Sequence, residues 1–262
     1  MDLQLAGRNA VVLGGSRGLG RAIASALAAE NANVLICSRS ADALEQTASE
    51  LEKLGSGSIN WHVADLADPD APASIHAAAI EALGGVDILV NNGGGPPPGL
   101  ITAVDRQTWE AQYQSMVTPL FELSGLCLPM MRERQWGRIL TVVSTGVQQP
   151  IPNLGISNTL RSSIIGWSKT LANEVASEGV TVNCLAPGRI ATDRVASLDR
   201  NAAERQGITP EEAKAQACSL IPMGRYGDPQ EFGDTAAFLL SPRGSYITGS
   251  VIRVDGGLVL GV

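Results

Sequence analysis

The chain has 262 residues, of which 44% are hydrophobic and 17% are charged, and its formal net charge is −7. The length allows one large α/β domain or two small ones, and the composition is typical of a packed globular protein rather than a disordered chain. The acidic charge argues against nucleic acid or an anionic membrane as a partner, because phosphate groups would be repelled. We expect a single domain.

The cysteines and the N-terminal segment indicate a cellular compartment. Cys37, Cys127, Cys184 and Cys218 are scattered, with no C-x-x-C pair, so we predict neither a metal site nor a disulfide framework. Residues 1–7 contain neither a basic segment nor a cleavable apolar one, and no apolar run reaches the roughly 18 residues of a membrane span. The sequence therefore predicts a soluble cytoplasmic protein.

Short apolar runs alternate with alanine-rich segments of helical length, which is typical of a parallel sheet covered by helices on both faces. The predicted strands are 9–13, 33–38, 59–64, 86–91, 138–144, 180–186 and 250–254. The predicted helices are 19–30, 41–54, 70–83, 105–132, 156–177 and 228–240. Residues 189–224 form a longer and more polar connection, which we interpret as a substrate lid.

The loop after the first predicted strand is rich in glycine, and a helical segment follows it directly. Glycines let backbone N–H groups approach a pyrophosphate, and a helix N-terminus supplies partial positive charge. Because the loop joins a strand to a helix, it predicts a dinucleotide-binding site rather than a plain turn. The residues expected to bind there are Gly14, Ser16, Arg17, Gly18, Leu19 and Gly20.

The end of the second predicted strand indicates which dinucleotide binds. Proteins specific for NAD typically have an acidic residue there, which bonds to the ribose hydroxyls. This chain has Ser38 and Arg39 instead, and a hydroxyl with a guanidinium binds the 2′-phosphate that a carboxylate would repel. NADP(H) is therefore the predicted cofactor, with Arg17 as a second cation. The alternative is that both arginines are solvated surface residues.

Several short motifs follow in a fixed order. They are Asn91-Asn92-Gly93-Gly94, the helical segment 166–176, Pro187-Gly188 and Val254-Asp255-Gly256-Gly257. With the glycine-rich loop they resemble the short-chain dehydrogenase/reductase family along essentially the whole chain, and most nearly its bacterial 3-oxoacyl-[acyl-carrier-protein] reductases. The resemblance implies one Rossmann-type domain over residues 1–262, with a doubly wound parallel sheet of about seven strands. It also implies a homotetramer built on the two longest helices and the C-terminal strand.

The same resemblance implies further residues around the cofactor. Asp65 and Leu66 would flank the adenine. The path of the ribose and the nicotinamide would be lined by Asn92, Gly93 and Gly94, and the nicotinamide with its carboxamide would meet Pro187, Gly188, Ile190 and Thr192. The alternative for each is an ordinary turn or strand-end residue, since backbone geometry alone can require glycine.

The family's catalytic pattern is only partly present. The resemblance implies a serine, a tyrosine, a lysine and an asparagine, and only the serine, Ser144, is retained. Ser157 and Arg161 occupy the tyrosine and lysine positions, and Met116 occupies the asparagine position. None of the three tyrosines has a lysine four residues later, so no shift of alignment restores the motif.

The two replacement residues still suggest a chemistry. Ser157 and Arg161 are four residues apart, so their side chains converge on one helical face. Arginine stays protonated and is a good anchor for a carboxylate or an oxyanion, whereas serine is a poor acid. We therefore hypothesise that Ser144 and Ser157 hold a carbonyl oxygen or a water while Arg161 stabilises negative charge. Tyr113 is a remote alternative acid, and the alternative for the pair is a helix face without function.

These observations leave three functions open. The first is an NADP(H)-dependent oxidoreductase that acts on a small-molecule carbonyl or alcohol, including one whose carboxylate Arg161 would bind. The second is a non-catalytic NADP(H) sensor or a partner subunit of an active homologue. The third is a lyase or isomerase that keeps the cofactor pocket. Nothing in the sequence identifies the substrate.

Overall fold

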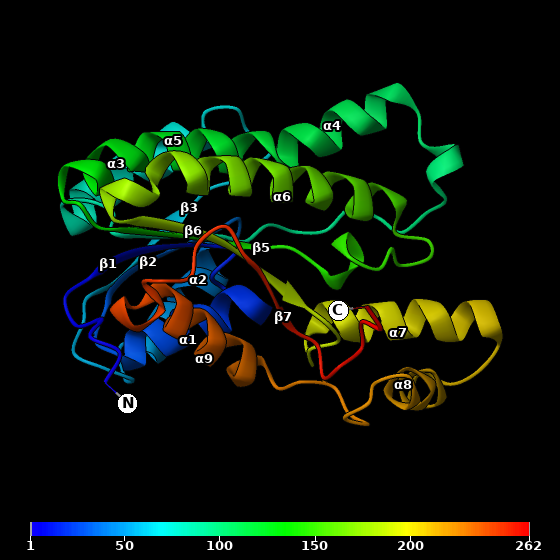
Figure 1. The fold of residues 1–262 in the computed structure, drawn as a ribbon. Coiled ribbons are helices and arrows are strands. Elements are labelled where there is room, and N and C mark those ends of the chain that lie inside the picture. Colours follow the sequence, from blue (N-terminus) through cyan, green and yellow to red (C-terminus); the bar gives the residue numbers. More distant parts are fainter. Residues whose placement is uncertain (1, 262) are drawn as a thin grey trace.

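A parallel seven-stranded sheet forms the middle layer of the molecule, with the strand order β3-β2-β1-β4-β5-β6-β7 (Figure 1). The strands are β1 Asn9–Leu13, β2 Asn33–Ser38, β3 Ile59–Val63, β4 Ile88–Asn91, β5 Gly137–Val142, β6 Val180–Pro187 and β7 Val251–Val254. The computed structural model describes residues 2–261, so Met1 and Val262, the two ends of the predicted domain, lie outside the described residues. The order reverses between β1 and β4, which is where doubly wound sheets bind ligands.

The central strands are buried along most of their length because helices cover both faces of the sheet there, whereas Trp61 and Val63 of the edge strand β3 are exposed. Side chains of a strand alternate between the faces. Val11 and Leu89 belong to one hydrophobic core, whereas Val12 and Val90 belong to the other. The two cores, one on each side, are what the continuous apolar runs of the sequence predict.

Helices form the two outer layers (Figure 1). One face carries α3 Ala71–Leu83, α4 Arg106–Met116, α5 Thr118–Glu133 and α6 Gly155–Val175, and the other carries α1 Gly18–Ala29, α2 Ala41–Leu51 and α9 Pro229–Leu240. Helices α1 and α9 touch backbone to backbone, since a Cβ at Gly233 would come within 2.5 Å of the Ala22 carbonyl oxygen. Among residues 2–261, no helix is both long and apolar enough to cross a membrane.

The helix predicted over residues 105–132 is wrong in one respect, because it is two helices. Val117 separates α4 from α5 with φ −120° and ψ −59°. Pro119 explains the break, since its ring clashes with the carbonyl of the preceding turn and it has no N–H to donate. The interruption changes the direction of the chain directly after Met116.

The polar connection at residues 189–224 also differs from the prediction, because it contains two further helices, α7 Asp193–Gln206 and α8 Pro210–Ser219. The Thr192 side chain accepts a hydrogen bond from the Val195 N–H at the start of α7, and Gly207 ends this helix with φ 66°. Thr209 and Glu212 form a capping box at the start of α8. These caps are readable in the sequence, but the polarity of the segment concealed them.

Candidate functional site

The glycine-rich loop and the loop after β4 meet at the carboxyl ends of the two central strands. The Asn92 side chain donates a hydrogen bond to the Leu13 carbonyl oxygen at 3.1 Å. Gly14 has φ +61°, and a Cβ there would lie 2.6 Å from the Asn92 side-chain nitrogen. Only glycine satisfies both the backbone conformation and this close approach. The two loops therefore pack against each other at the carboxyl ends of β1 and β4.

The first turn of α1 is prepared for an anion. Arg17 precedes the helix in an extended conformation, its side chain does not cap the helix, and the first turn contains no acidic residue. A Cβ at Gly20 would lie 2.2 Å from the Gly14 carbonyl oxygen, so the loop packs tightly on the helix. The N–H groups of this turn have no partner within the helix, and the helix dipole adds positive charge. Gly18 and Leu19, which open the helix, are half-buried.

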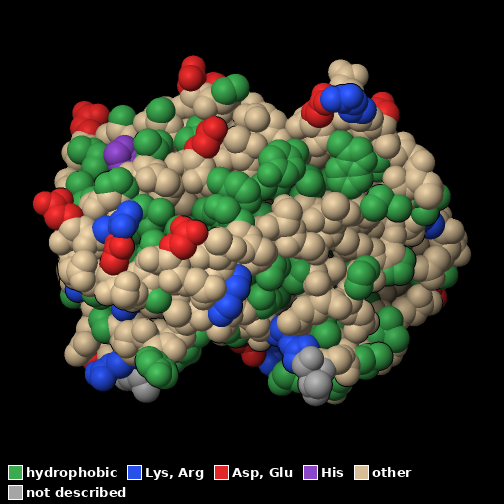
Figure 2. All heavy atoms as spheres, turned by 45° about the horizontal axis from the view of Figure 1, so that its top comes forward, with side chains coloured by type: hydrophobic (Ala, Val, Ile, Leu, Met, Phe, Trp, Pro, Cys, Tyr) green, Lys and Arg blue, Asp and Glu red, His purple; other side chains and the backbone are tan. Residues whose placement is uncertain are grey.

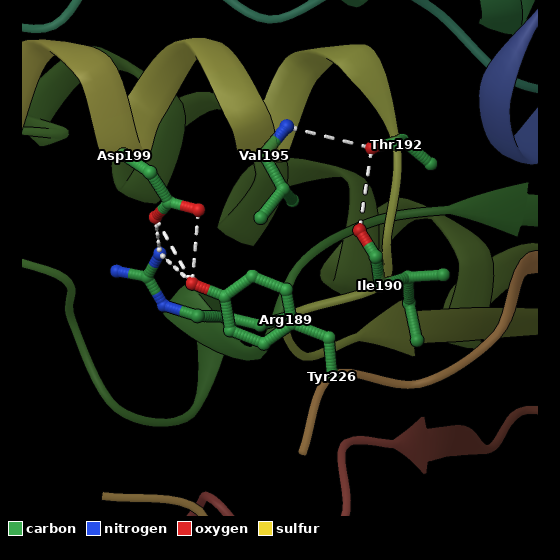
Figure 3. A network of polar contacts seen from close by, with 6 residues as sticks. All are labelled: Arg189, Ile190, Thr192, Val195, Asp199 and Tyr226. Atoms are coloured by element: carbon green, nitrogen blue, oxygen red, sulfur yellow. Dashed lines mark hydrogen bonds and ion pairs between the residues drawn. The ribbon is translucent and has the colours of Figure 1, made fainter. Parts of the chain in front are cut away.

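The end of β6 and the segment after it lie opposite the glycine-rich loop. Gly188 donates a backbone hydrogen bond to Val254 at 2.9 Å, and Pro187 pairs with Val254 in the sheet. Thr192 faces Gly18, because a Cβ on the glycine would lie 3.8 Å from the threonine methyl group. Its hydroxyl also contacts Ile190 O at 3.3 Å (Figure 3). The structure thus brings the glycine-rich loop and the Pro187–Thr192 segment together.

The end of β2 offers groups suited to a phosphate. The Ser38 hydroxyl is buried, and it has no hydrogen-bond partner within residues 2–261. Arg39 and Arg17 are exposed, and neither belongs to an ion pair within the described chain. An unpartnered hydroxyl beside two uncompensated guanidinium groups fits the 2′-phosphate of NADP(H).

The remaining predicted cofactor residues lie at the same end of the sheet. Asp65 follows β3 and is exposed, and its carboxylate accepts a hydrogen bond from Ala67 at 3.1 Å. A Cβ at Gly93 would lie 3.9 Å from the Leu66 side chain, whereas one at Gly94 would meet nothing within 4 Å. Open space above Gly94 is what a bound ribose or nicotinamide needs.

Ser144 and Ser157 lie on neighbouring elements. Ser144 follows β5, and its hydroxyl accepts a hydrogen bond from the Gly146 N–H at 3.0 Å. Ser157, in the first turn of α6, is 9% exposed. Among the described residues no hydrogen bond joins the two serines. Asn158 fixes the intervening loop, because its side-chain amide donates to Ile151 O at 2.9 Å and accepts from Ile151 N at 3.3 Å.

Arg161 lies one turn after Ser157, and its side chain connects β5, the strand that leads to Ser144, with the loop after β4. Its guanidinium donates to the Val142 carbonyl oxygen at 2.8 Å and to the Gly94 carbonyl oxygen at 3.4 Å. Burial, and secondly the charge of Arg194, lower the pKa of Arg161 to about 10. The side chain therefore stays cationic at neutral pH.

Sequence reasoning missed Arg194, which reaches the same loop from α7. Its guanidinium donates to the Pro96 carbonyl oxygen at 3.0 Å. The only indication of Arg194 in the sequence is its position two residues after the predicted cofactor residue Thr192, and its role becomes visible only through the tertiary contact. By contrast, Met116 is 7% exposed and packs in the core, while Tyr113 is 43% exposed. The core location of Met116 leaves no polar group at the expected asparagine position.

An open cavity of about 460 Å³ lies against the start of α6 and the loop before it, and neither Ser144 nor Ser157 belongs to its lining. Gly146 and Asn158, which neighbour Ser144 and Ser157 in the chain, belong to its wall. Apolar side chains supply much of the remaining lining, which includes Ile101, Val147, Pro150 and Ile151. Such a wall suits the organic part of a small substrate.

A polar network anchors α7 to its surroundings (Figure 3). Asp199 is 6% exposed, and its carboxylate contacts the Arg189 guanidinium at 2.8 Å and the Tyr226 hydroxyl at 3.0 Å. Burial is the main cause that raises the pKa of Tyr226 to about 12. Since Arg189 precedes α7 and Tyr226 precedes α9, the network ties together both ends of the 189–224 segment.

Comparisons with known proteins agree with this geometry. A family model described as enoyl-(acyl carrier protein) reductase matches residues 14–259. The 3-oxoacyl-[acyl-carrier-protein] reductase FabG of Vibrio cholerae is 34% identical over 260 residues, covering 98% of this chain and all of the relative. The NADPH-dependent reductase BacG of Bacillus subtilis is 32% identical over 251 residues, covering 95% and 97%.

A solved structure extends the similarity to three dimensions. The L-sorbose reductase of Gluconobacter frateurii, complexed with NADPH and L-sorbose, superposes with a TM-score of 0.94. It is 29% identical to this chain, and each of the two chains is covered completely. The match includes the strands and the helices that carry the candidate site.

Proposed function

The chain belongs to the short-chain dehydrogenase/reductase family, and we propose that it is an NADP(H)-dependent oxidoreductase acting on a small carbonyl or alcohol. The observation that carries the proposal is the set of groups gathered at the carboxyl ends of the parallel strands. Gly18 faces Thr192, the unpartnered hydroxyl of Ser38 lies at the end of β2, and Arg161 approaches Gly94 after β4. The NADPH named for BacG and for the sorbose reductase supports the same cofactor.

Each cofactor residue has a task in this proposal. The N–H groups of Gly18, Leu19 and Gly20 bind the pyrophosphate, and Ser38, Arg39 and Arg17 bind the 2′-phosphate. Asp65 and Leu66 flank the adenine. The nicotinamide half lies against the remaining predicted residues, Asn92, Gly93, Gly94, Pro187, Gly188, Ile190 and Thr192. Bound NADPH supplies a hydride.

The side chains at the other wall bind and polarise the substrate. Ser144 and Ser157 donate hydrogen bonds to the substrate oxygen or to a water beside it. Arg161, which stays protonated, stabilises the negative charge that develops on this oxygen. A serine hydroxyl transfers a proton poorly, so the chain binds the developing charge more effectively than it neutralises it.

The segment 189–224 completes the proposed site as a lid. Helix α7 starts at Thr192, which faces the glycine-rich loop, and the Asp199 network holds this helix in place. Movement of α7 would admit the cofactor and the substrate. The positions of Arg189 and Tyr226 at the two ends of the segment make them its anchors.

We also propose that the protein is a cytoplasmic homotetramer. All four cysteines are unpaired, which suits a reducing compartment. Hydrophobic side chains gather over α4, α5 and α6 in Figure 2. Phe121 of α5 stacks on Trp167 of α6 with the ring centroids 4.3 Å apart. Leu126, on α5, is 40% exposed. An apolar face of this kind is typical of a subunit interface.

Two measurements on the purified protein test the function. NADPH and NADH are titrated by fluorescence, and NADPH oxidation is followed with 3-oxoacyl thioesters, diketones, quinones and 2-oxo acids. We expect NADPH to bind more tightly than NADH and at least one carbonyl class to be reduced. Tight NADPH binding without turnover of any compound in the panel would refute the proposal of an enzyme. It would favour the sensor or the partner subunit, which the loss of the tyrosine and lysine also supports.

A double variant separates a changed mechanism from a lost one. Ser157→Tyr with Arg161→Lys restores the family's pair, and reduction of an ordinary 3-oxoacyl thioester should then increase. Glu204→Gln on the exposed side of α7 is the matched control, and it should leave both readouts unchanged. No gain in the double variant would mean that Met116 and the surrounding pocket also prevent the ordinary reaction.

A further inference from the structure

Two arginines from different elements converge on the loop after β4. Arg161, on α6, donates to Gly94 O at 3.4 Å, and Arg194, on α7, donates to Pro96 O at 3.0 Å. The two accepting residues, Gly94 and Pro96, are two positions apart in the chain, so their backbones are separated by at most about 7 Å. A Cβ at Gly95 would lie 3.2 Å from the Arg194 guanidinium, which shows how closely this side chain crosses the loop.

Neither guanidinium is neutralised by the protein. Within residues 2–261 the six ion pairs include neither Arg161 nor Arg194. The positive charge of Arg194 is the second cause, after burial, that lowers the pKa of Arg161. Arg194 is exposed, so water screens part of the repulsion between the two like charges, and an anion that bridges them would remove the rest. The two guanidinium groups therefore have no anionic partner among the described residues, and an anionic ligand would supply one.

We propose that Arg161 and Arg194 together bind the carboxylate of the substrate, so that the substrate is a small oxo acid or its hydroxy acid. This inference rests on the proposed function and specifies its substrate class. Arg161 also bonds to Val142 O at 2.8 Å, two residues before Ser144. The carboxylate site thus adjoins the serine strand, which places the carboxylate only a few bonds from the reacting carbonyl.

The surroundings distinguish this site from the phosphate sites of the cofactor. The residues assigned to the 2′-phosphate, Ser38 and Arg39, end β2, whereas Arg161 and Arg194 reach the loop after β4. The cavity of about 460 Å³ beside Asn158 is lined largely by uncharged groups. Neither arginine belongs to this lining, so the cavity offers no cationic group, and the two guanidinium groups are the ones suited to a charged end.

The first test measures binding, so it does not require turnover. The protein saturated with NADP⁺ is titrated calorimetrically with oxalate and, separately, with the neutral analogue oxamide. We expect oxalate to bind and oxamide not to bind. Arg194→Gln should weaken oxalate binding at least tenfold, since hydrogen bonds to charged groups contribute about 1.5–3 kcal/mol. Arg200→Gln, an exposed position on the same helix, is the matched control.

The second test asks whether the pair serves the cofactor instead. NADPH affinity should change less than twofold in Arg194→Gln, and Arg161→Lys should retain more oxalate binding than Arg161→Gln. If Arg194→Gln loses NADPH affinity but keeps oxalate affinity, the proposal is overturned and Arg194 is assigned to the dinucleotide. Equal affinity for oxalate and oxamide would overturn it as well.

A kinetic comparison links the site to the reaction. Pyruvate and acetoacetate should be reduced with a higher kcat/KM than methyl pyruvate and methyl acetoacetate, and Arg194→Gln should remove the preference mainly through KM. Preference for the esters in the unmodified protein would refute the carboxylate site while leaving the oxidoreductase intact. If no carbonyl is reduced but oxalate binds as described, the reaction class is wrong and the anion site stands.

Discussion

Replacing Asp199 with alanine should release the proposed lid without unfolding the sheet. The carboxylate is nearly fully buried and accepts from Arg189 at 2.8 Å and from Tyr226 at 3.0 Å. Breaking a fully buried pair costs about 3–5 kcal/mol, but the Arg189 side chain is 35% exposed and regains water. We therefore expect a loss of about 2–3 kcal/mol in the free energy of opening residues 189–224.

Hydrogen exchange measures this quantity directly. A loss of 2–3 kcal/mol corresponds to a roughly 30- to 150-fold increase in the open population. Peptides within 189–224 should therefore exchange faster by that factor, while peptides from β1 and β4 stay unchanged. Glu204→Ala, an exposed change on the same helix, is the control. Unchanged exchange in the Asp199→Ala lid, or equal acceleration in the sheet, would refute the reasoning.

Three further predictions follow from other parts of the structure. The raised pKa of Tyr226 means that the folded state holds its proton more tightly than the unfolded state. Its contribution to stability is therefore complete below pH 10 and disappears as the pH rises to about 12. In urea unfolding, Tyr226→Phe should lose less of its unfolding free energy between pH 10 and pH 12 than the unmodified protein. Gly20→Ala places a Cβ 2.2 Å from the Gly14 carbonyl oxygen, so stability should fall by about 1–3 kcal/mol and NADPH titration should show weaker binding, whereas normal affinity would contradict the tight loop. Leu126→Arg puts a charge on the apolar α5 face and should reduce the mass measured by light scattering, with Leu54→Arg as an exposed control; an unchanged mass would exclude this face as an interface.

The fold was largely predictable because burial on both faces leaves a strong apolar pattern in the central strands. Predicted strands 9–13 and 33–38 agree with β1 and β2 at both ends, and the other strand ends shift by at most two residues. The break at Val117 was missed because the apolar pattern continues through it, although Pro119 was a local signal. Helices α7 and α8 were not predicted because the segment is polar throughout, although Thr192 and Thr209 are typical N-cap residues.

The site was predictable only where a function depends on backbone geometry. The close approach of Gly14 and Asn92 follows from a strand that turns into a helix, and this is a local pattern. The meeting of Arg161 with Arg194 joins residues 33 positions apart on two helices, and no periodicity encodes it. The buried, unpartnered hydroxyl of Ser38 is likewise a property of the packed chain.

The replaced catalytic residues lead to a definite division of labour. Reduction of a carbonyl develops negative charge on its oxygen, and this charge must be stabilised and finally protonated. In the proposed reaction Arg161 would meet the first need at neutral pH, because even a pKa of about 10 leaves it cationic. Neither serine is acidic enough for the second need, and the core packing of Met116 removes the side chain that would hold a relay. In the proposed reaction the proton would then come from water.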